Sequence, residues 1–430
     1  MRIVAAILLA ACLIPTLGRS DEAPASCPFG PGDLPITTNP AGLHGAQIPI
    51  EHIIVLMQEN RSFDHYFSTL HARNNDIEKI PRGASNPNPV TGKPIRPFHQ
   101  SQMCETADLD HGWNHTHQAW NNGAMDGFTT INVDPTDPTG RRAMGYYKYH
   151  DLPFYFGLYS TFAISDRHFC SLLGPTHPNR HYLLAGTSFG LVSNTFPSVT
   201  TDWSARTIFE ELDDAGVTWK TYNAQLAFAQ LYAYVRDTGA DNLAPIANFF
   251  TDAAAGTLPQ VTYIDPAFFG DDENDEHPPS NAQKGQKFVA DIVQALFASP
   301  LWSSSALIIT YDEHGGFWDH VPPPPACEPD DTLPILKPND VMARFDRYGV
   351  RVPLVVVSPY SRRKYVSHTT TDQTSVLRFI QTRFDLPALT RRDANASALL
   401  EMFDFDHPSF LTPPSLPPAT INPVRAQQCR

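Results

Sequence analysis

The sequence predicts an α/β protein whose mainly parallel central sheet has helices on both faces. Short apolar runs alternate along the chain with segments of helical character. The runs are apolar at nearly every position, which is typical of strands buried on both faces. Alternation of such strands with helices indicates crossover connections, and these join parallel strands.

The same patterns place the individual elements. We expect a helix over Gln286–Ala298, because Phe288, Ile292, Ala295 and Leu296 recur on one side with the helical period. The other expected elements are the strands Ile53–Met57, Val217–Tyr222, Val261–Ile264, Leu307–Tyr311 and Val352–Val357 and the helices Ala205–Ala215 and Asp372–Arg383.

Composition limits the class of protein. The 430 residues are 42% hydrophobic, which is enough for a large core. Forty prolines beside 11% aromatic residues indicate long ordered loops rather than disorder. The net charge of -14 and the lack of a basic run argue against nucleic-acid binding. Phosphate substrates stay open, because a bound cation can reverse the local field.

The two ends of the chain have their own character. Residues 1–20 read as a secretory signal peptide: Arg2 precedes an apolar core, and the small residues Gly18 and Ser20 follow at cleavage spacing. The alternatives are a membrane anchor, for which the run is short, and a lipoprotein signal at Cys12. We therefore expect a secreted or periplasmic protein, with an irregular arm over 21–47. The Pro-rich tail 401–430 is expected to pack on the surface.

Cysteine usage fits export. Five cysteines remain after the expected cleavage, and an exported protein can oxidise them. Because five is odd, at least one stays outside any internal pair. We expect a bridge between Cys327 and Cys429, because both lie in Pro-rich irregular segments. No cysteine spacing resembles a zinc site.

Acidic and amide side chains follow two of the expected strands. Ile53–Met57 leads to the pair Glu59–Asn60, and Leu307–Tyr311 leads to the pair Asp312–Glu313. Ligands of open α/β sheets bind just past the carboxyl ends of the strands. Carboxylate and amide oxygens suit a hard divalent cation such as Mg²⁺, Ca²⁺ or Mn²⁺. Taken singly, each pair is equally typical of a helix cap or a solvated loop, and that alternative stays open.

A candidate nucleophile lies in the stretch GPTHPNRH, residues 174–181. Pro178 suits the first turn of a helix, which would place the Thr176 hydroxyl beside free backbone N–H groups, a site suited to phosphate. Arg180 could then clamp phosphate oxygens. Alternatively, Thr176 only caps the helix. The T-x-P-x-R pattern also resembles the sulfatase signature, but it lacks the Cys or Ser that sulfatases convert.

Histidines supply candidates for proton transfer. A phosphoryl-transfer enzyme needs a group that can protonate the leaving oxygen, and imidazole is suited to that task. A histidine next to Pro or Trp is also commonly a hydrogen-bonded loop residue. The candidates are His111, His115, His117, His277, His320 and His368.

Five of these stretches together carry a resemblance. They are EHIIVLMQENRSFDHYF, the HxW…WNNGxMDGF stretch, FCSLLGPTHPNRHYLLAGT, NDEHPP and ITYDEHGGFWDHVPPP, in this order between about residues 50 and 385. In this the chain resembles the bacterial phosphoesterase family, which contains non-haemolytic-type phospholipases C, plant non-specific phospholipases C and a branch of acid phosphatases.

The resemblance implies an alkaline-phosphatase-like catalytic domain over residues 48–400 with one divalent metal ion, whether Mg, Ca, Mn or Zn. Matched residue by residue, Glu59 and Asn60 fall on the first metal ligands, and the pair Asp312–Glu313 falls on the later ones. Thr176 falls on the nucleophile, which also touches the metal. His111 and His277 match histidines near the phosphate, whereas His320 and His368 match none so closely.

The expected function follows from the resemblance. It implies a secreted metal-dependent phosphoric ester hydrolase that forms a phosphothreonine intermediate. Phospholipase C action on phospholipids such as phosphatidylcholine is favoured, and an acid phosphatase acting on phosphomonoesters is the alternative. A secreted metal-binding protein without turnover is a more remote alternative. Transient membrane contact could involve the aromatic segment 152–160 or Phe268–Phe269, although core packing is the simpler reason for both.

Overall fold

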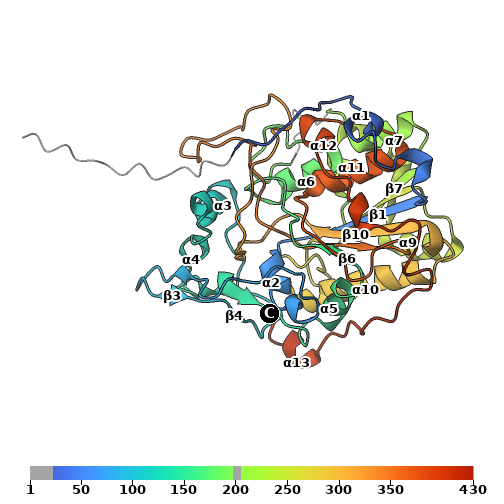
Figure 1. The fold of residues 1–430 in the computed structure, drawn as a ribbon. Helices are drawn as coiled ribbons and strands as arrows, with labels where there is room; N and C mark the ends of the chain where they lie inside the picture. Colours follow the sequence, from blue (N-terminus) through green and yellow to red (C-terminus); the bar gives the residue numbers. More distant parts are fainter. Residues whose placement is uncertain (1–22, 197–204, 430) are drawn as a thin grey trace, which may run out of the picture.

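A central sheet of eight strands organises the molecule (Figure 1). The computed structural model describes residues 23–196 and 205–429, and the predicted signal peptide 1–20 lies outside them. Across the sheet the strands run in the order β12-β6-β11-β10-β1-β9-β7-β8. The strands are β1 His52–Gln58, β6 Ala163–Ser165, β7 Trp219–Asn223, β8 Leu243–Pro245, β9 Val261–Asp265, β10 Ser305–Tyr311, β11 Leu354–Val357 and β12 Val366–Ser367.

All strand pairs of this sheet are parallel except those made by β11, which runs antiparallel to both β10 and β6. β1 lies between β9 and β10, and alternate residues face opposite layers. Ile54 and Leu56 enter one apolar core, whereas Ile53 and Val55 enter the other. The apolar runs in the sequence are explained by this double burial, and the predicted fold class is confirmed.

Helices cover both faces of the sheet. In Figure 1, α6, α11 and α12 lie above it, and α5 and α10 lie below it. The longer helices are α3 Trp113–Trp120, α5 Pro153–Tyr159, α6 Thr176–Ala185, α7 Ile208–Asp214, α9 Ile246–Ala255, α10 Ala282–Ala298 and α11 Gln373–Phe384. The short ones are α1 Pro35–Thr38, α2 Phe63–Phe67, α4 Phe128–Ile131, α8 Ala233–Asp237, α12 Arg391–Ala394 and α13 Pro423–Ala426.

The five expected strands and three expected helices all form, with ends displaced by a few residues. The sequence patterns did not reveal β6, β8 and β12, which have three, three and two residues. Strands this short carry too little alternation to be seen as a pattern. The paired segments β2 Asn86–Pro87, β3 Pro94–Ile95, β4 Phe98–His99 and β5 Gly145–Tyr146 lie outside the main sheet.

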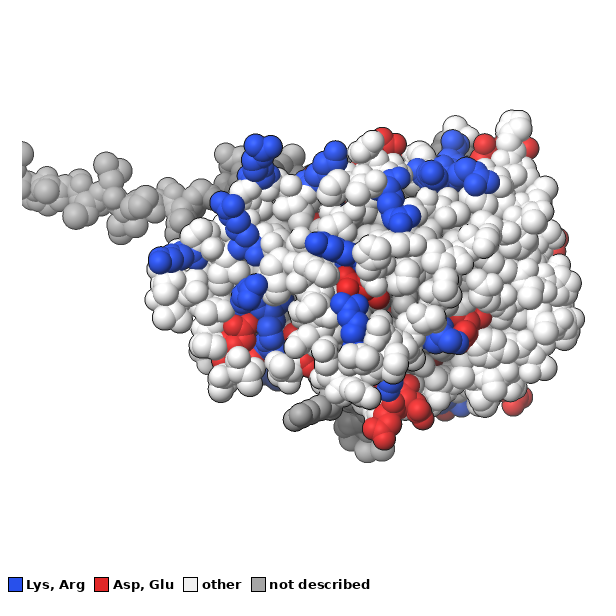
Figure 2. All heavy atoms as spheres, turned by 90° about the horizontal axis from the view of Figure 1, so that it is seen from below, with Lys and Arg blue, Asp and Glu red and all other residues white. Residues whose placement is uncertain are grey.

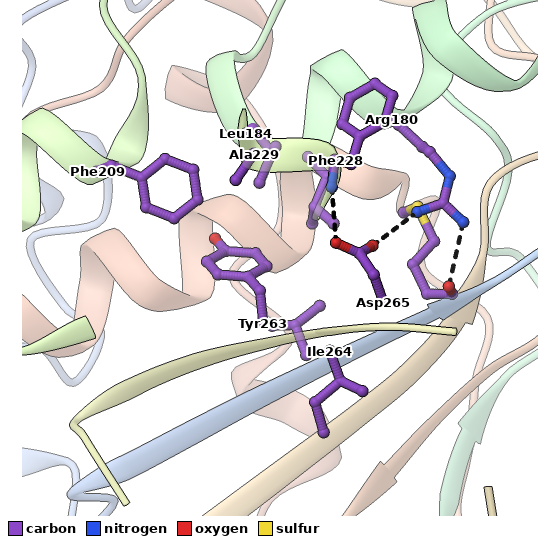
Figure 3. A pocket seen from close by; sticks show the side chains of 11 residues that line it. Arg180, Leu184, Phe209, Phe228, Ala229, Tyr263, Ile264 and Asp265 are labelled. Atoms are coloured by element: carbon purple, nitrogen blue, oxygen red, sulfur yellow. Dashed lines mark hydrogen bonds and ion pairs between the residues drawn. The ribbon is translucent and has the colours of Figure 1, made fainter. Parts of the chain in front are cut away.

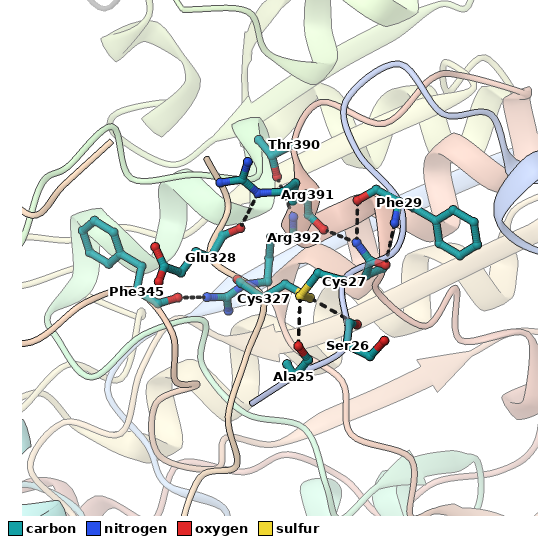
Figure 4. The surroundings of a disulfide bond; sticks show 11 residues. Ala25, Ser26, Cys27, Phe29, Cys327, Glu328, Phe345, Thr390, Arg391 and Arg392 are labelled. Carbon is teal, nitrogen blue, oxygen red and sulfur yellow. Dashed lines mark hydrogen bonds between the residues drawn. A yellow bond between two sulfur atoms is a disulfide. The ribbon is translucent and has the colours of Figure 1, made fainter. Parts of the chain in front are cut away.

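Two disulfides connect the ends of the chain to the domain. Cys27 pairs with Cys327 (Figure 4) and Cys104 pairs with Cys429. The expected bridge between Cys327 and Cys429 is therefore wrong, because each of these tail and loop cysteines meets a partner from the N-terminal third of the chain. Cys170 is buried and free, in line with the odd number. The disulfides hold the arm 23–47 and the C-terminal tail on the folded core.

The aromatic segment 152–160 forms α5, and its side chains from Phe154 to Tyr159 are buried in the core. For this segment the sequence allows either membrane contact or core packing, and the structure shows core packing. Phe269, by contrast, is 64% exposed. Within residues 23–196 and 205–429, no helix has both the length and the apolarity needed to cross a membrane.

The visible surface carries its charges in small separate groups. Figure 2 shows Lys and Arg side chains on the face seen from below, with Asp, Glu and uncharged residues between them. On this face the basic residues do not form one continuous stripe.

Candidate active site

Two adjacent parallel strands deliver four candidate ligands to one point at the carboxyl edge of the sheet. β1 and β10 are paired so that Gln58 lies beside Tyr311. The pairs Glu59–Asn60 and Asp312–Glu313, which come next, therefore begin at the same level. The backbone N–H of Asn60 donates to Asp312 Oδ1 at 3.0 Å. All four side chains are buried.

A close backbone approach holds these two strand ends together. Asn60 has a left-handed conformation with φ 61°, which Asn adopts more readily than most residues. Gly315 packs directly on this turn, and a Cβ at that position would lie 2.3 Å from the Asn60 carbonyl oxygen. The glycine in DEHGG is thus required by the contact between the two ligand-bearing turns.

Negative charge in this group is left uncompensated. Asn60 Oδ1, Asp312 Oδ2 and Glu313 Oε1 are buried and have no hydrogen-bond partner among the described residues. Burial and the charge of Glu59 raise the pKa of Asp312 to about 6. Burial and the charge of Asp312 raise the pKa of Glu313 well above its ordinary value. Unpartnered oxygens with excess negative charge are a donor set that a hard divalent cation satisfies.

Arg180 braces the first of these strand ends (Figure 3). Its Nε donates to Glu59 Oε1 at 3.0 Å, its Nη1 to Asp265 Oδ1 at 3.2 Å and its Nη2 to the Met57 carbonyl at 3.2 Å. Asp312 Oδ2 lies 3.8 Å from Nε. The guanidinium is thus turned toward the sheet edge and engaged by protein acceptors, and the phosphate clamp expected from the sequence stays a prediction.

Thr176 is the first residue of α6. The turn before it is fixed by Asn179, whose Nδ2 donates to the Gly174 carbonyl at 2.9 Å. Thr176 precedes Arg180 by four residues, so the two lie on one face of the helix. Because Arg180 reaches Glu59, this face points to the candidate ligands. The Thr176 side chain lies in the first turn of α6, where the helix dipole favours an anion. In this turn the His177 N–H is donated to Asn194 Oδ1 at 2.8 Å, and the residue after it is Pro178, which has no N–H.

His111 orients one of the candidate ligands. Its Nδ1 is 2.7 Å from the Leu109 carbonyl, which requires a proton on that nitrogen. Nε2 of the neutral ring then accepts from Asn60 Nδ2 at 3.3 Å. This bond turns Asn60 Oδ1 away from the histidine, toward the acidic group. Nε2 also lies 3.9 Å from Glu313 Oε1.

His277 lies beside His111, with the ring centroids 5.8 Å apart, and is partly exposed. Its Nδ1 donates to the Pro278 carbonyl at 2.6 Å, so Nε2 is the nitrogen that can gain or lose a proton. Nε2 is 3.7 Å from Asp108 Oδ2. Asp108, His111 and His277 bring ligand-type atoms within 4.8 Å of one another. The two predicted histidines are therefore in one place, but they differ in exposure and in partners.

The loop that carries His277 is anchored by Glu276. Its buried carboxylate accepts hydrogen bonds from the hydroxyls of Tyr66 at 2.5 Å, Tyr311 at 2.9 Å and Tyr155. Glu276 itself has φ 78°, a left-handed conformation that is costly for a residue with a side chain. The three tyrosine contacts stabilise this backbone and so fix where the next residue, His277, emerges.

Sequence reasoning missed three acidic residues of the site. Asp265 ends β9 and binds Arg180; the rule applied to the ends of β1 and β10 could have found it. Asp275 is buried beside Glu59, and burial together with the charge of Glu59 raises its pKa well above the ordinary value. Glu276 gave no signal, because nothing in the sequence shows that three distant tyrosines converge on it.

A pocket of about 430 Å³ opens beside these groups. Its lining includes His111 and Asp108 from the histidine loop, and Pro175, the residue before Thr176. The opposite side includes Ile335 and Lys337 from a surface segment. A substrate bound in this pocket would therefore lie beside the residue that precedes α6 and beside His111, which contacts the candidate ligand Asn60.

The comparison with protein-family models decides the relationship. The model described as "Phosphoesterase family" matches residues 50–387. The chain belongs to the phosphoesterase family. This phosphoesterase is 35% identical to "Phospholipase C B" of Mycobacterium tuberculosis over 87% of its own length and 84% of that protein. It is 33% identical to "Non-hemolytic phospholipase C" of Pseudomonas aeruginosa, covering 87% of its own length and 60% of that protein.

Solved structures add weaker likenesses. The phosphoesterase matches a protein of the alkaline phosphatase superfamily from Vibrio parahaemolyticus with 9% identity and TM-score 0.38, covering 75% of this chain and 76% of that one. It matches the lipoteichoic acid synthase LtaP of Listeria monocytogenes with 10% identity and TM-score 0.38, covering 82% and 78%. The predicted hydrolase class, acting on phosphoric ester bonds, is confirmed by the family and by the named relatives.

Two further predicted histidines have structural partners elsewhere in the phosphoesterase. His320 Nδ1 is 2.6 Å from Asp64 Oδ2, and Arg351 joins Asp64 and Asp319 in the same buried group. His368 Nδ1 is 2.8 Å from Asp166 Oδ1. No contact among the described residues joins either histidine to the candidate ligands.

Proposed function

We propose that this phosphoesterase is a metal-dependent phospholipase C that forms a phosphothreonine intermediate. The observation that carries the proposal is the set of three unpartnered buried oxygens on Asn60, Asp312 and Glu313 beside the start of α6. The names of the relatives, phospholipases C at 33–35% identity, support the choice of substrate class. In this proposal residues 48–400 form the catalytic domain.

The metal would be held by Glu59, Asn60, Thr176 and the pair Asp312–Glu313. When bound, one divalent ion supplies charge neutralisation for the phosphate and lowers the pKa of a coordinated hydroxyl. The chain's own contribution is to place these oxygens in advance. Arg180 holds Glu59, and the His111 ring holds the Asn60 amide with its oxygen toward the group.

Thr176 is the proposed nucleophile. Its hydroxyl gives its proton to solvent, and Oγ attacks phosphorus, forms a phosphothreonine and expels the alcohol of diacylglycerol. The dipole at the N-terminus of α6 stabilises the negative charge of the phosphate at this step. His277, protonated on Nε2 beside Asp108, donates its proton to the leaving alkoxide. The same nitrogen then takes a proton from the water that releases the phosphorylated headgroup.

Proposed export is supported by the two disulfides, since bridges persist in oxidising compartments and are rare in the cytosol. The predicted signal peptide over residues 1–20 belongs to this proposal. A secreted or periplasmic enzyme of this class would meet phospholipids at a membrane surface or phosphomonoesters in solution.

The test compares hydrolysis of phosphatidylcholine and of a soluble phosphomonoester by the purified mature protein. Thr176→Ala is expected to lower turnover by about three orders of magnitude or more. Without the nucleophile, the other catalytic residues can no longer contribute to the covalent step. Thr176→Ser should retain part of the activity, and the exposed Thr251→Ala in α9 is the matched control. EDTA should abolish turnover, and added divalent metal should restore it.

Each outcome separates one part of the proposal. Diacylglycerol release that disappears in Thr176→Ala and in EDTA supports all of it. Turnover of the monoester alone would assign the same site to an acid phosphatase. Phospholipid turnover that survives Thr176→Ala would rule out the covalent step, and activity in EDTA would rule out the metal.

A further inference from the structure

The surface segment 331–343, here called the rim segment, forms one side of the pocket. Ile335 and Lys337 line it directly. Three apolar side chains of the rim segment are strongly exposed: Leu333 at 59%, Ile335 at 63% and Met342 at 87%. A soluble surface commonly carries isolated exposed apolar residues, but three on one short segment that lines a pocket are a feature that needs a partner.

This exposure is built into the fold. Leu336, Val341 and Ala343 of the same segment pack against the apolar cluster that contains Trp113 and Val192. The side chains of the rim segment therefore divide into an inward set that anchors it and an outward set that does not.

Hydrogen bonds fix the backbone of the rim segment in this position. The Ile335 N–H donates to the Gly190 carbonyl at 2.8 Å, and the Trp113 Nε1–H donates to the Val341 carbonyl at 3.0 Å. Asn114 Oδ1 accepts from the Val341 N–H at 2.7 Å. The apolar side chains are held outward by an ordered loop.

The charged residues around the apolar side chains differ in their partners. Asp331 binds Arg391 at 2.8 Å, and Asp340 accepts from Asn114 and from the Lys337 backbone N–H. The Lys337 ammonium has no ion-pair partner among the described residues. Lys337 is thus a cation beside the exposed apolar residues that is available to a lipid phosphate, whereas the Asp340 carboxylate is occupied by hydrogen bonds from neutral N–H groups.

We propose that the rim segment docks this phosphoesterase on a phospholipid surface. Leu333, Ile335 and Met342 enter the boundary of the acyl chains, and Lys337 meets the phosphate layer. Apolar insertion beside a cation is the usual physics of interfacial binding. Because Ile335 and Lys337 also line the pocket, a lipid drawn from that surface would enter it headgroup first. The proposal rests on the proposed function for its substrate, but the docking itself does not require turnover.

Vesicle binding tests the proposal without turnover. In the Thr176→Ala background, sedimentation with phosphatidylcholine vesicles containing phosphatidylglycerol measures the partition of the protein. The double substitution Leu333→Gln/Met342→Gln is expected to weaken binding by about tenfold, because each loses apolar area from the interface. The matched control is Val90→Gln/Val424→Gln, two residues at 71% and 69% exposure away from the pocket, and it should bind as before.

Substrate form separates docking from catalysis. With Thr176 intact, the Leu333→Gln/Met342→Gln protein should lose hydrolysis of vesicle lipid by a similar factor and keep its turnover of a soluble phosphate ester. Lys337→Gln should weaken binding to anionic vesicles and reduce its salt dependence.

Three results would overturn the proposal. They are unchanged vesicle binding in the Leu333→Gln/Met342→Gln protein, an equal loss in the Val90→Gln/Val424→Gln control, and a change confined to self-association by light scattering. Vesicle binding that depends on the rim segment in a protein with no phospholipase activity would leave the docking surface standing and reject the proposed substrate.

Discussion

Two buried acidic groups lie near the carboxyl ends of the central strands, and they differ in how their charge is balanced. In one, Arg351 binds Asp319 at 2.9 Å and Asp64 at 3.2 Å, and His320 adds a second partner to Asp64. In the other, Arg180 binds Glu59 and lies 3.8 Å from Asp312 Oδ2, while oxygens of Asp312 and Glu313 have no hydrogen-bond partner within the described structure.

The pKa directions follow this contrast at Asp64, although burial raises the pKa of Asp319 despite the neighbouring Arg351. Although burial opposes it, the His320 hydrogen bond and the Arg351 charge lower the pKa of Asp64. Burial and neighbouring acids raise the pKa values of Asp312 and Glu313. A buried acid with its own cation is part of the framework, whereas one without a cation is prepared for an external one. The difference identifies the site better than acidity does, since both groups are acidic.

Replacing Arg351 is expected to change the free energy of unfolding more than any other substitution considered. Arg351→Met should lower the free energy of unfolding by about 3–5 kcal/mol, because Asp64 and Asp319 would remain buried without their partner. Chemical denaturation measures it. Arg344→Met is the control, since that arginine pairs with Glu328 at the surface, and its effect should be much smaller. Equal effects of the two substitutions would refute the contrast.

Removing a negative charge from the group with Asp312 and Glu313 should raise the free energy of unfolding. In EDTA, Glu313→Gln should raise the free energy of unfolding by about 1–2 kcal/mol, because it removes one of the repelling charges around Asp312. The same change should abolish activity by removing a proposed ligand. Asp319→Asn is the matched control and should destabilise, since its acid is already balanced by Arg351. A loss of stability in both proteins would show that the charge of the group with Asp312 and Glu313 is balanced as well.

Some features of this site could be predicted from the sequence and others could not, for physical reasons. Glu59, Asn60, Asp312 and Glu313 could be predicted because strand ends are local features and parallel strands finish at one edge. The orientation of Arg180 could not, because it depends on Asp265 and Glu59 from two other strands. Disulfide partners likewise depend on long-range folding, and the pairing of Cys27 with Cys327 left no local signal.

The weakest expected effect extends the comparison to a buried acid whose ion pair is long and partly exposed to solvent. Glu211 in α7 is buried, and Arg206 is 3.9 Å away on the surface. Burial and the charge of Asp393 raise its pKa to about 8. A raised pKa means that the folded state favours the protonated acid, so the stability it contributes is present at low pH and is lost as the pH rises toward 8.

Glu211→Gln fixes the neutral form and should flatten that dependence. At pH 8.5 the variant is expected to be more stable than the parent by about 1 kcal/mol, and at pH 5.5 the difference should shrink toward zero. Denaturation curves at the two pH values measure it. Glu210→Gln is a poor control because Glu210 forms the capping box of α7 with Thr207, so the exposed Asp291→Asn serves instead. A gain that is equal at both pH values would mean that Glu211 stays ionised in the fold. A buried carboxylate could then stay ionised without a close protein cation, a bound metal ion or a proton. The difference in charge balance between the two acidic groups would then not identify a metal site.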